Sequence, residues 1–222
     1  MSEETKIRFK FNKIKEFRYL SHLEAVRLII MAVNRTGIDI KYSSGFNPNP
    51  KISFSFPVPV GLASYAEYSD IEIHGILNAQ DFKMKMNLQL KEGMNILEAK
   101  NTAGKISSLM ADIKFVSYCF ILKDINKNNA EKIKNELLNS SEFSNAIYSQ
   151  NMVKDEDNSD IVKLNLIGYT KLLKNNKIFK FNNFLKYFKY LSNSNGVVVK
   201  DYFKEEAYVL REGILKTPLE IV

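Results

Sequence analysis

The chain has 222 residues, of which 45% are hydrophobic and 26% are charged. This balance is typical of a globular protein and excludes wholesale disorder, and no apolar run approaches the roughly 18 residues that span a bilayer. The 32 Lys and Arg residues outnumber 25 Asp and Glu residues by seven, which permits binding to nucleic acid without requiring it. A single cysteine, Cys119, excludes an internal disulfide, and the first residues lack the apolar core of a signal peptide. We therefore expect a cytoplasmic protein that does not bind membranes.

The first predicted strand covers residues 6–11. Its residues alternate between apolar and basic side chains, so Lys6, Arg8 and Lys10 are expected on a basic outer face. Ser21 is followed three residues later by Glu24, a capping-box pattern that predicts the start of an amphipathic helix.

The remaining elements of the first half follow from the same patterns. Gly37 is expected to end the first helix. Further strands are predicted over residues 38–42, 52–56, 67–73 and 95–99, and a second helix over residues 79–90. Residues 103–108 are the expected linker to the second half.

Four of the five prolines lie between Tyr42 and Ile73, in the sequence YSSGFNPNPKISFSFPVPVGLASYAEYSDIEI. Proline fixes φ and removes a backbone donor, so this density predicts a rigid, shaped loop, which we place at residues 43–65. An ordinary connection is shorter and less apolar. The loop is therefore the first candidate for a functional segment.

The second half repeats the order of elements without evident residue identity. Strands are predicted over residues 113–123, 161–168 and 197–203, and helices over 129–138 and 183–191, with a polar break after the first helix. The pattern favours an α+β fold of two ferredoxin-like (βαββαβ) halves packed together, with mainly antiparallel sheets, over residues 1–102 and 109–222. A single irregular α+β domain is the alternative.

The sequence contains neither a phosphate-binding glycine motif nor enough cysteine and histidine for a cysteine-rich zinc or iron–sulfur site, so no metal or cofactor is expected. His22 lies in the first turn of the capped helix, where the helix dipole disfavours imidazolium, so a neutral base beside a bound phosphate or ribose is one interpretation. A polar residue near the cap is the other. His74 is expected to be structural.

Asp70 and Glu72 share one face of a strand and could hold a metal or a basic partner, although solvated charges explain them equally well. The stronger charge signal is basic. Residues 161–200 contain eight lysines and no acidic residue, interleaved with aromatic side chains, the combination that binds single-stranded nucleic acid. However, the aromatic residues of 184–191 have helical spacing and are expected mostly in the core.

The segment SHLEAVRLIIMAVNRTGIDIKYSSGFNPNPKISFSFPVPVG, which starts at Ser21, resembles the bacterial radical-SAM-linked protein family, whose members occur alone or fused to radical-SAM proteins. The resemblance is specific over about the first 75 residues. Here Glu24 replaces an aspartate of the family pattern, and Asn49 replaces a histidine between the two prolines. The second change leaves His22 as the only motif histidine, so it favours binding over catalysis in the loop.

The resemblance, with the basic strand, implies one surface feature formed by the first helix, the loop and the following strand. The candidate catalytic residue is His22. The candidate binding residues are Lys6, Arg8, Lys10, Arg18, Ser21, Arg35, Tyr42, Ser43, Gly45, Phe46, Asn47, Pro48, Asn49, Pro50, Lys51, Glu67 and Asp70.

Three functions are compatible with these features. The first is an RNA-binding or RNA-modification accessory protein, with tRNA and rRNA as candidate ligands, that works with a separate radical-SAM enzyme. The second is a metal-independent RNA-processing enzyme that uses His22 with Tyr42 and Lys51, by fold analogy alone. The third is a protein scaffold for the radical-SAM partner. Of these, the sequence favours the accessory protein, without catalytic activity of its own.

Overall fold

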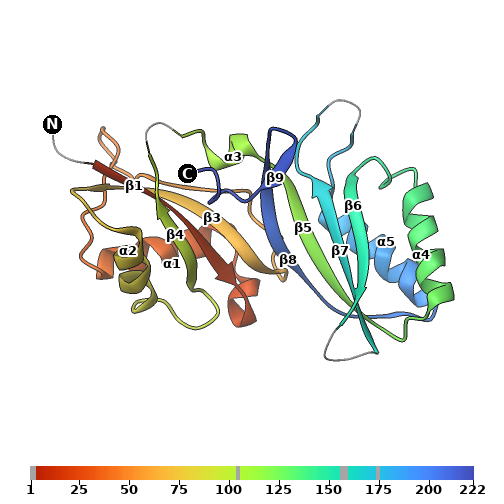
Figure 1. Cartoon of the computed structure of the whole chain (residues 1–222). Coiled ribbons are helices and arrows are strands. Elements are labelled where there is room, and N and C mark those ends of the chain that lie inside the picture. The colour runs from red at the N-terminus through yellow and green to blue at the C-terminus, as the bar shows by residue number, and fades with distance from the viewer. Residues whose placement is uncertain (1–3, 104–105, 156–159, 174–175) are drawn as a thin grey trace. The chain divides into compact units, whose positions relative to one another are not determined.

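The computed structural model describes residues 4–103, 106–155, 160–173 and 176–222 and divides into two units (Figure 1). Unit 1 comprises the described residues of Met1–Ile113 and Val209–Val222, and unit 2 comprises those of Lys114–Tyr208. This division differs from the expected one, because residues 209–222 belong to unit 1 rather than to the second half. Part of the predicted linker, residues 104 and 105, lies outside the described residues.

Unit 1 is a mixed α/β unit. Its elements are β1 (Glu4–Lys13), a 3₁₀ helix (Lys15–Tyr19), α1 (His22–Arg35), β2 (Ile52–Phe54), β3 (Ala63–His74), α2 (Ala79–Asn87), β4 (Ile96–Asn101), α3 (Leu109–Asp112) and β9 (Ile214–Lys216). The strand order is β4-β1-β3, and β2 also pairs with β3. The pairings of β1 with β3, β1 with β4 and β2 with β3 are antiparallel.

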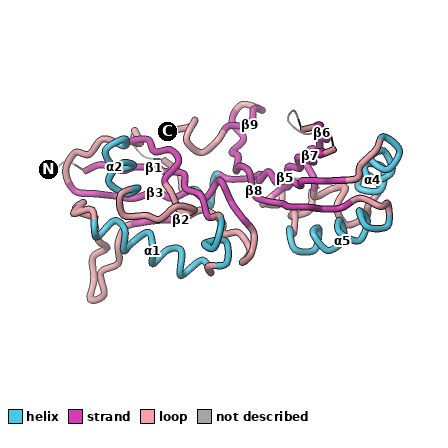
Figure 2. Tube along the Cα trace, turned by 90° about the horizontal axis from the view of Figure 1, so that it is seen from below, coloured by secondary structure: helices cyan, strands magenta, loops and turns pink. Residues whose placement is uncertain are grey.

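The core of unit 1 lies on the face of its sheet that α1 and α2 cover. Ile7 and Phe9 of β1 are fully buried there and belong to one cluster with Ile29 of α1 and Phe82 of α2. The ring centroids of Phe9 and Phe82 are 5.2 Å apart. Figure 2 shows α1 running along one side of strands β1 and β3. The predicted alternation of β1 therefore places its apolar side chains correctly.

The opposite face of β1 is not the exposed basic surface that the alternation predicted. Arg8 is completely buried and makes a bidentate pair with Asp70, its cross-strand partner on β3, with Nε–Oδ1 and Nη2–Oδ2 distances of 2.7 and 3.0 Å. Its remaining donors reach the carbonyl oxygens of Ser107 and Pro218, at 3.2 Å each. The segment before α3 and the C-terminal segment therefore cover this face, which strand periodicity alone could not reveal.

Two further details of unit 1 correct the sequence predictions. Residues 38–42, all of which the structure describes, form isolated bridges from Ile40 to Ile73 and from Tyr42 to Pro50 rather than a continuous strand. The first helix ends as expected before Gly37, which has a φ of 71°. Helix α3 lies just after the predicted linker and was not predicted.

Unit 2 is also a mixed α/β unit. Its elements are β5 (Ile113–Lys123), α4 (Lys127–Asn139), β6 (Ile147–Lys154), β7 (Ile161–Tyr169), α5 (Phe181–Ser194) and β8 (Val198–Arg211), whose last three residues belong to unit 1. The strand order is β8-β5-β7-β6. Strand β6 lies in the segment predicted as a polar break. The prediction missed it because the strand is at the edge of the sheet, where most of its side chains are polar and few apolar residues mark a buried face.

Aromatic side chains form the core of unit 2. The ring of Phe120 on β5 lies 5.6 and 4.9 Å from those of Phe184 and Phe188 on α5, centroid to centroid. Both α5 rings are fully buried, which confirms the prediction that they belong to the core rather than to a stacking surface. Gly168 on β7 leaves room for Phe179, because a Cβ at this glycine would lie 2.5 Å from that ring. Among the described helices, none is long and apolar enough to cross a membrane.

The buried pair makes a first prediction about stability. Arg8→Met leaves the Asp70 carboxylate buried, with the half-exposed Lys6 at 3.6 Å as its remaining cation in the described residues, and should lower the free energy of unfolding by about 3–5 kcal/mol. Urea unfolding measures the change. The double variant Arg8→Met/Asp70→Leu should recover most of the loss, because no charge is then left unpaired in the interior.

The control is Lys85→Met, the loss of an exposed cation on α2, which should change the free energy of unfolding by no more than about 0.5 kcal/mol. Equal losses in the Arg8→Met single variant and the double variant would contradict the assignment of Arg8 and Asp70 as a coupled pair.

The buried thiol of Cys119 makes a second prediction. Burial, reinforced by the negative charge of Glu205, raises the pKa of Cys119 to about 11, and the side chain is 2% exposed. Because the thiolate is the reactive form, iodoacetamide at pH 8 should leave the folded protein unmodified over the time in which the urea-unfolded chain reacts completely. Mass spectrometry follows the reaction, and equal rates in the folded and unfolded chains would show that Cys119 is accessible.

Candidate functional site

The residues predicted from the sequence as one site lie at three separate places in unit 1. His22 and Glu67 line a small cavity at the N-terminal end of α1. The motif residues 42–51 form a hairpin that follows the other end of α1, about 20 Å away along the helix axis. Arg8 and Asp70 form the buried pair on the face of the sheet that α1 does not cover. The structure therefore separates Arg8 and Asp70 from His22 and from the hairpin, because the alternation of β1 directs its basic and apolar side chains to opposite faces.

The cavity beside His22 has a volume of about 10 Å³, which is room for one water molecule. The His22 ring is exposed and packs edge-on against Phe54, with 5.8 Å between ring centroids. The other polar lining residues are Lys13, Ser55, Glu67 and Tyr68. Neither Tyr42 nor Lys51 lines this cavity, so the described geometry does not place them beside His22.

Sequence reasoning left Lys13 and Ser64 out of the site. Lys13 is 3% exposed and its Nζ donates a hydrogen bond to the carbonyl oxygen of Leu20 at 2.9 Å. Ser64 pairs with Lys13 across β1 and β3 and donates to Glu67 Oε1 at 2.6 Å. The signal for Lys13 was present in the sequence, since it continues the parity of Ile7, Phe9 and Phe11 and therefore lies on the helix-covered face.

The start of α1 is fixed by the predicted capping box. The hydroxyl and backbone N–H of Ser21 both donate to Glu24 Oε2, at 2.6 and 2.8 Å, and the N–H of Glu24 donates back to Ser21 Oγ. The hydrogen bond from the Ser21 side chain, followed by that from its backbone, lowers the pKa of Glu24. Glu24, which stands where the resembled motif has an aspartate, thus preserves the cap, and Ser21 is engaged in local structure.

Arg18 joins the 3₁₀ helix to the proline-rich loop. Its Nε donates to the carbonyl oxygen of Gly61 at 2.6 Å, and the N–H of Gly61 donates to the carbonyl oxygen of Arg18 at 2.8 Å. These reciprocal bonds give Arg18 a structural role. Arg35 is exposed in the last turn of α1, at the end of that helix nearer in sequence to the hairpin.

The hairpin of residues 42–50 is held by bonds across its two arms. The N–H of Ser43 donates to the carbonyl oxygen of Asn49 at 2.9 Å, and the N–H of Asn49 donates to Ser43 Oγ at 3.0 Å. The side-chain amide of Asn49 donates to the carbonyl oxygen of Asn47 at 3.1 Å. Asn49, which stands where the resembled motif has a histidine, therefore stabilises the shape of the tip. Figure 2 shows this loop projecting beside one end of α1.

The tip of the hairpin is exposed. The exposed run covers residues 44–49, and within it the Phe46 side chain is fully exposed, with a relative accessibility of 106%. Gly45 has a φ of 131°, a backbone region that side chains other than glycine rarely adopt. Pro48 and Pro50 restrict the returning arm. The hairpin thus presents an aromatic ring to solvent on a restrained backbone.

The base of the hairpin is joined to β3 and carries positive charge. Backbone bonds connect Lys41 and Lys51 to Glu72 from both sides, at 2.9 and 3.0 Å. The Nζ atoms of Lys41 and Lys51 lie 3.9 and 3.5 Å from the Glu72 carboxylate. Two lysines therefore flank one carboxylate at the base of the exposed aromatic tip. Tyr42, at the foot of the hairpin, is 43% exposed.

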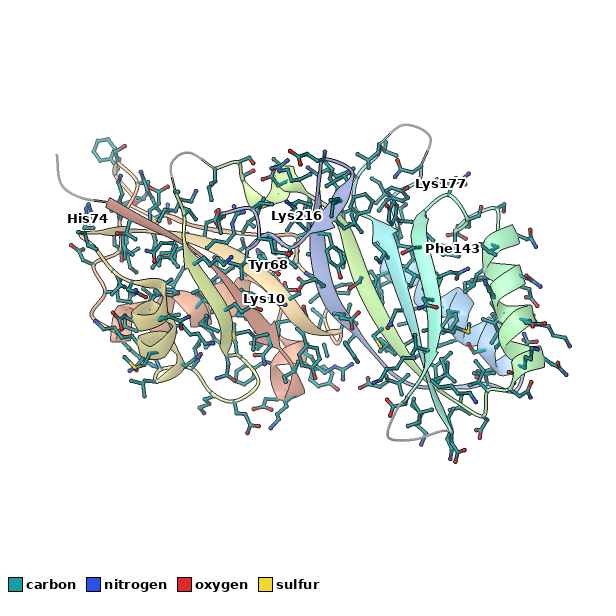
Figure 3. All side chains as sticks on the ribbon, viewed as in Figure 1. Lys10, Tyr68, His74, Phe143, Lys177 and Lys216 are labelled. Atoms are coloured by element: carbon teal, nitrogen blue, oxygen red, sulfur yellow. The ribbon has the colours of Figure 1, made fainter. Side chains whose placement is uncertain are left out.

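The remaining predicted cations of β1 are only partly exposed. Lys10 is half-buried opposite Tyr68 of β3, and Figure 3 shows the two side chains on neighbouring strands. Lys6 is half-buried and lies 3.6 Å from Asp70. His74 ends β3 and is exposed. In the part of the chain that the structure describes, no group of three or more His, Cys, Asp or Glu side chains is placed to hold a metal ion.

The model of a family described as "Uncharacterized protein conserved in bacteria (DUF2344)" matches residues 6–182. The chain belongs to this family. The match includes both the α1 cavity and the hairpin, and most of unit 2. No curated protein matches the chain.

Two solved structures illustrate the similarities among known folds. One is a protein assigned as a glycine cleavage system transcriptional repressor, at 10% identity and a TM-score of 0.28, with 91% of this chain and 99% of that chain covered. The other is the small subunit of acetolactate synthase from Thermotoga maritima, at 10% identity and a TM-score of 0.28, with 96% and 98% covered. At these scores neither carries an inference about the function of this family member.

The capping box makes a third prediction. Ser21→Ala removes the principal hydrogen bond that lowers the pKa of Glu24, so this pKa should rise toward its ordinary value, and the lost cap should cost about 0.5–2 kcal/mol near neutral pH. A lowered carboxyl pKa stabilises the fold above the ordinary pKa, and the effect is lost as pH falls through the folded value. The cost of the substitution should therefore shrink in acid.

NMR titration of the Glu24 side chain, with urea unfolding at several pH values, checks both effects. Ser44→Ala, at an exposed serine of the hairpin, is the matched control and should leave the Glu24 titration unchanged. An unaltered Glu24 titration in Ser21→Ala would contradict the role given to the Ser21 hydroxyl.

Proposed function

We propose that this protein is a cytoplasmic RNA-binding accessory protein that uses the hairpin of residues 42–50 to bind unpaired bases and works with a separate radical-SAM enzyme. The observation that carries the proposal is the fully exposed Phe46 at the tip of a restrained hairpin. Burying such a ring would be the ordinary outcome of folding, since an aromatic side chain contributes a large apolar surface. A preorganised, exposed ring is instead suited to stacking on a base.

The charge beside the hairpin supports an anionic ligand. Lys41 and Lys51 share Glu72 at its base, Arg35 lies exposed at the end of α1, and the whole chain carries a net charge of +7. Lysines neutralise phosphates and release counterions, while aromatic rings bind bases without sequence preference. Both chemistries therefore meet at one end of unit 1.

The radical-SAM partnership is supported by the motif resemblance. Glu67 and the segment from Ser21 to Lys51 match the pattern of a family whose members also occur joined to radical-SAM proteins. The 222 residues contain one cysteine and so do not supply the three cysteine ligands of a radical-SAM cluster, and we propose that a separate enzyme holds that cluster. RNA binding would then be this protein's contribution to the joint reaction.

The enzyme hypothesis based on His22 receives less support from the geometry. The cavity that His22 lines is too small for a phosphodiester and contains neither Tyr42 nor Lys51 among its lining residues. The Lys13, Ser64 and Glu67 side chains nearby are buried and hydrogen-bonded within the unit. We therefore place RNA binding at the hairpin and a structural role at the α1 cavity.

We further propose that each unit is a ferredoxin-like half. The order β1-α1-β2-β3-α2-β4 in unit 1 and β5-α4-β6-β7-α5-β8 in unit 2 supports this proposal, as do the corresponding strand orders β4-β1-β3-β2 and β8-β5-β7-β6. In this arrangement the hairpin of unit 1 is an insertion between its first helix and its second strand. Unit 2 has α4 followed by residues 140–146 at the corresponding position.

The fourth prediction tests the proposal. Phe46→Ala should weaken binding to a fluorescein-labelled single-stranded 12-mer RNA by about 5- to 150-fold, the loss of one base-stacking contact. The slope of the binding constant against salt should stay the same, because no phosphate contact is removed. Lys51→Gln should instead reduce that slope by about 0.7. Fluorescence anisotropy across a salt series measures both effects.

Leu88→Ala, at the exposed apolar residue that follows α2, is the matched control and should bind like the natural protein. Equal affinities for Phe46→Ala and Leu88→Ala would exclude the hairpin as the binding element. RNA binding that is missing even at low salt, with a radical-SAM enzyme still co-purifying, would instead favour the scaffold function.

A further inference from the structure

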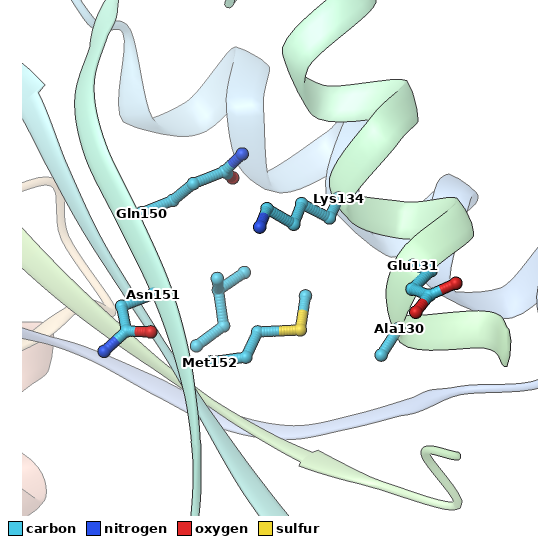
Figure 4. Close-up of a pocket in the computed structure, with 7 residues that line it drawn as sticks. Ala130, Glu131, Lys134, Gln150, Asn151 and Met152 are labelled. Carbon is cyan, nitrogen blue, oxygen red and sulfur yellow. The ribbon is translucent and has the colours of Figure 1, made fainter. Parts of the chain in front are cut away.

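Unit 2 contains a cavity between α4 and β6, far in sequence from the motif segment. Its volume is about 200 Å³, and its lining includes Ala130, Glu131 and Lys134 from α4, Gln150 and Met152 from β6, and Leu164 from β7. Figure 4 shows Lys134 and Gln150 extending into the same space between the helix and the strand. The volume is enough for one planar ring system, and less than the space usual for a drug-sized ligand.

The feature that singles out this cavity is the carboxamide of Gln150. Both its Oε1 and its Nε2 are buried, and neither has a hydrogen-bond partner. A buried polar group left unsatisfied destabilises a fold, and an amide carries a donor and an acceptor side by side. A ligand that offers one acceptor and one donor on the same edge can satisfy the carboxamide by displacing the side chains that cover it.

The strand register explains why the amide lies inside. Gln150 is opposite Leu166, and Met152 is opposite Leu164, in the antiparallel pair of β6 and β7. Leu164 and Leu166 are buried on the helix-covered face, and alternation places Gln150 and Met152 on that face with them. A polar residue thus occupies a position that packing would assign to an apolar one.

The rest of the lining suits a base with its sugar and phosphate. Met152, Leu164 and Ala130 offer an apolar wall, and a thioether packs well on aromatic rings. Glu131 and Lys134 are three residues apart on α4 and exposed, so they share one side of the helix at the mouth. In the described part of the chain neither makes an ion pair or a side-chain hydrogen bond. Lys134 can meet a phosphate, and Glu131 can accept from a ribose hydroxyl.

We propose that this cavity binds the adenine base of a nucleotide, with the Gln150 carboxamide on the donor and acceptor edge of the base and Lys134 on the phosphate. Adenine is the base whose N6 and N7 a glutamine side chain pairs with in a bidentate manner. The nucleotide can be free or part of an RNA strand, since both present the same edge. The proposal rests on unit 2 alone and stands or falls separately from the hairpin.

Isothermal titration calorimetry of the full chain with AMP tests the proposal. The comparison ligands are purine riboside 5′-monophosphate, which lacks the 6-amino donor, and ribose 5-phosphate, which lacks the base. We expect AMP to bind with a dissociation constant below 1 mM, purine riboside monophosphate to bind at least about fivefold more weakly, and ribose 5-phosphate not to bind, because a bidentate pair contributes about 1–3 kcal/mol of discrimination. No binding of AMP at 1 mM, or equal binding of AMP and purine riboside monophosphate, overturns the proposal.

Variants then locate the site. Gln150→Met keeps the length of the side chain and removes an unsatisfied buried amide, so the variant should fold at least as well as the natural protein. It should weaken AMP binding at least about tenfold and remove the preference for the 6-amino group. Gln89→Met, a half-buried glutamine of unit 1, is the matched control and should bind AMP normally. An unchanged affinity for AMP in Gln150→Met overturns the proposal, and thermal melting confirms that each variant is folded.

A short oligoadenylate of six nucleotides distinguishes the two sources of adenine. If the oligonucleotide binds more tightly than AMP, and Gln150→Met weakens that binding, the cavity binds a base within an RNA strand. If the oligonucleotide and AMP bind with equal affinity, the cavity binds a free nucleotide. Phe46→Ala serves as the reference for the hairpin: it should leave AMP binding unchanged, so failure of the hairpin proposal and failure of this one give different results. Loss of AMP binding in Phe46→Ala, with normal binding in Gln150→Met, overturns the assignment to this cavity.

Discussion

The ion pair between Arg8 and Asp70 is the constraint on which the rest of unit 1 depends. Both side chains are buried, and the guanidinium uses its further donors on the carbonyl oxygens of Ser107 and Pro218. Two strands, the segment before α3 and the C-terminal segment therefore meet at one side chain. A buried charge is costly unless its partners are all present, so this pair requires residues more than 200 positions apart in sequence to be in place together. The division of the chain, with residues 209–222 in unit 1, has this physical origin.

With one face of the sheet occupied in this way and the other covered by α1 and α2, little of the sheet of unit 1 is left to bind a ligand. The hairpin of residues 42–50 is the exception, because it leaves the sheet beyond Glu72 and carries Phe46 into solvent. Its shape comes from local bonds between Ser43 and Asn49, from a glycine at positive φ and from two prolines. Function at this site would therefore rest on preorganisation, in which the entropy cost of ordering the loop is met during folding rather than during binding.

The two proposed binding elements use opposite physical principles. At the hairpin an apolar ring is exposed where burial would be favourable, whereas at the α4–β6 cavity the polar carboxamide of Gln150 is buried where exposure would be favourable. Each departs from the usual distribution of apolar and polar groups. The lysine-rich segment of residues 161–200, which had the composition of a nucleic-acid surface, obeys the usual distribution instead: its phenylalanines form the core of unit 2, and Lys163 and Lys177 are engaged with Asp155 and Ser141.

Short-range chemistry was readable from the sequence. The capping box of Ser21 and Glu24, the apolar face of β1, and the helical spacing of Phe184 and Phe188 all depend on residues a few positions apart, and all are present in the structure. The tertiary structure alone decided that Arg8 and the amide of Gln150 are buried. Arg8 reads as an exposed cation because its partners Asp70, Ser107 and Pro218 are distant in sequence, and Gln150 reads as part of a polar break because β6 gains its buried face only from α4 and β7. The burial of these two side chains depends on contacts between distant segments, which local periodicity does not show.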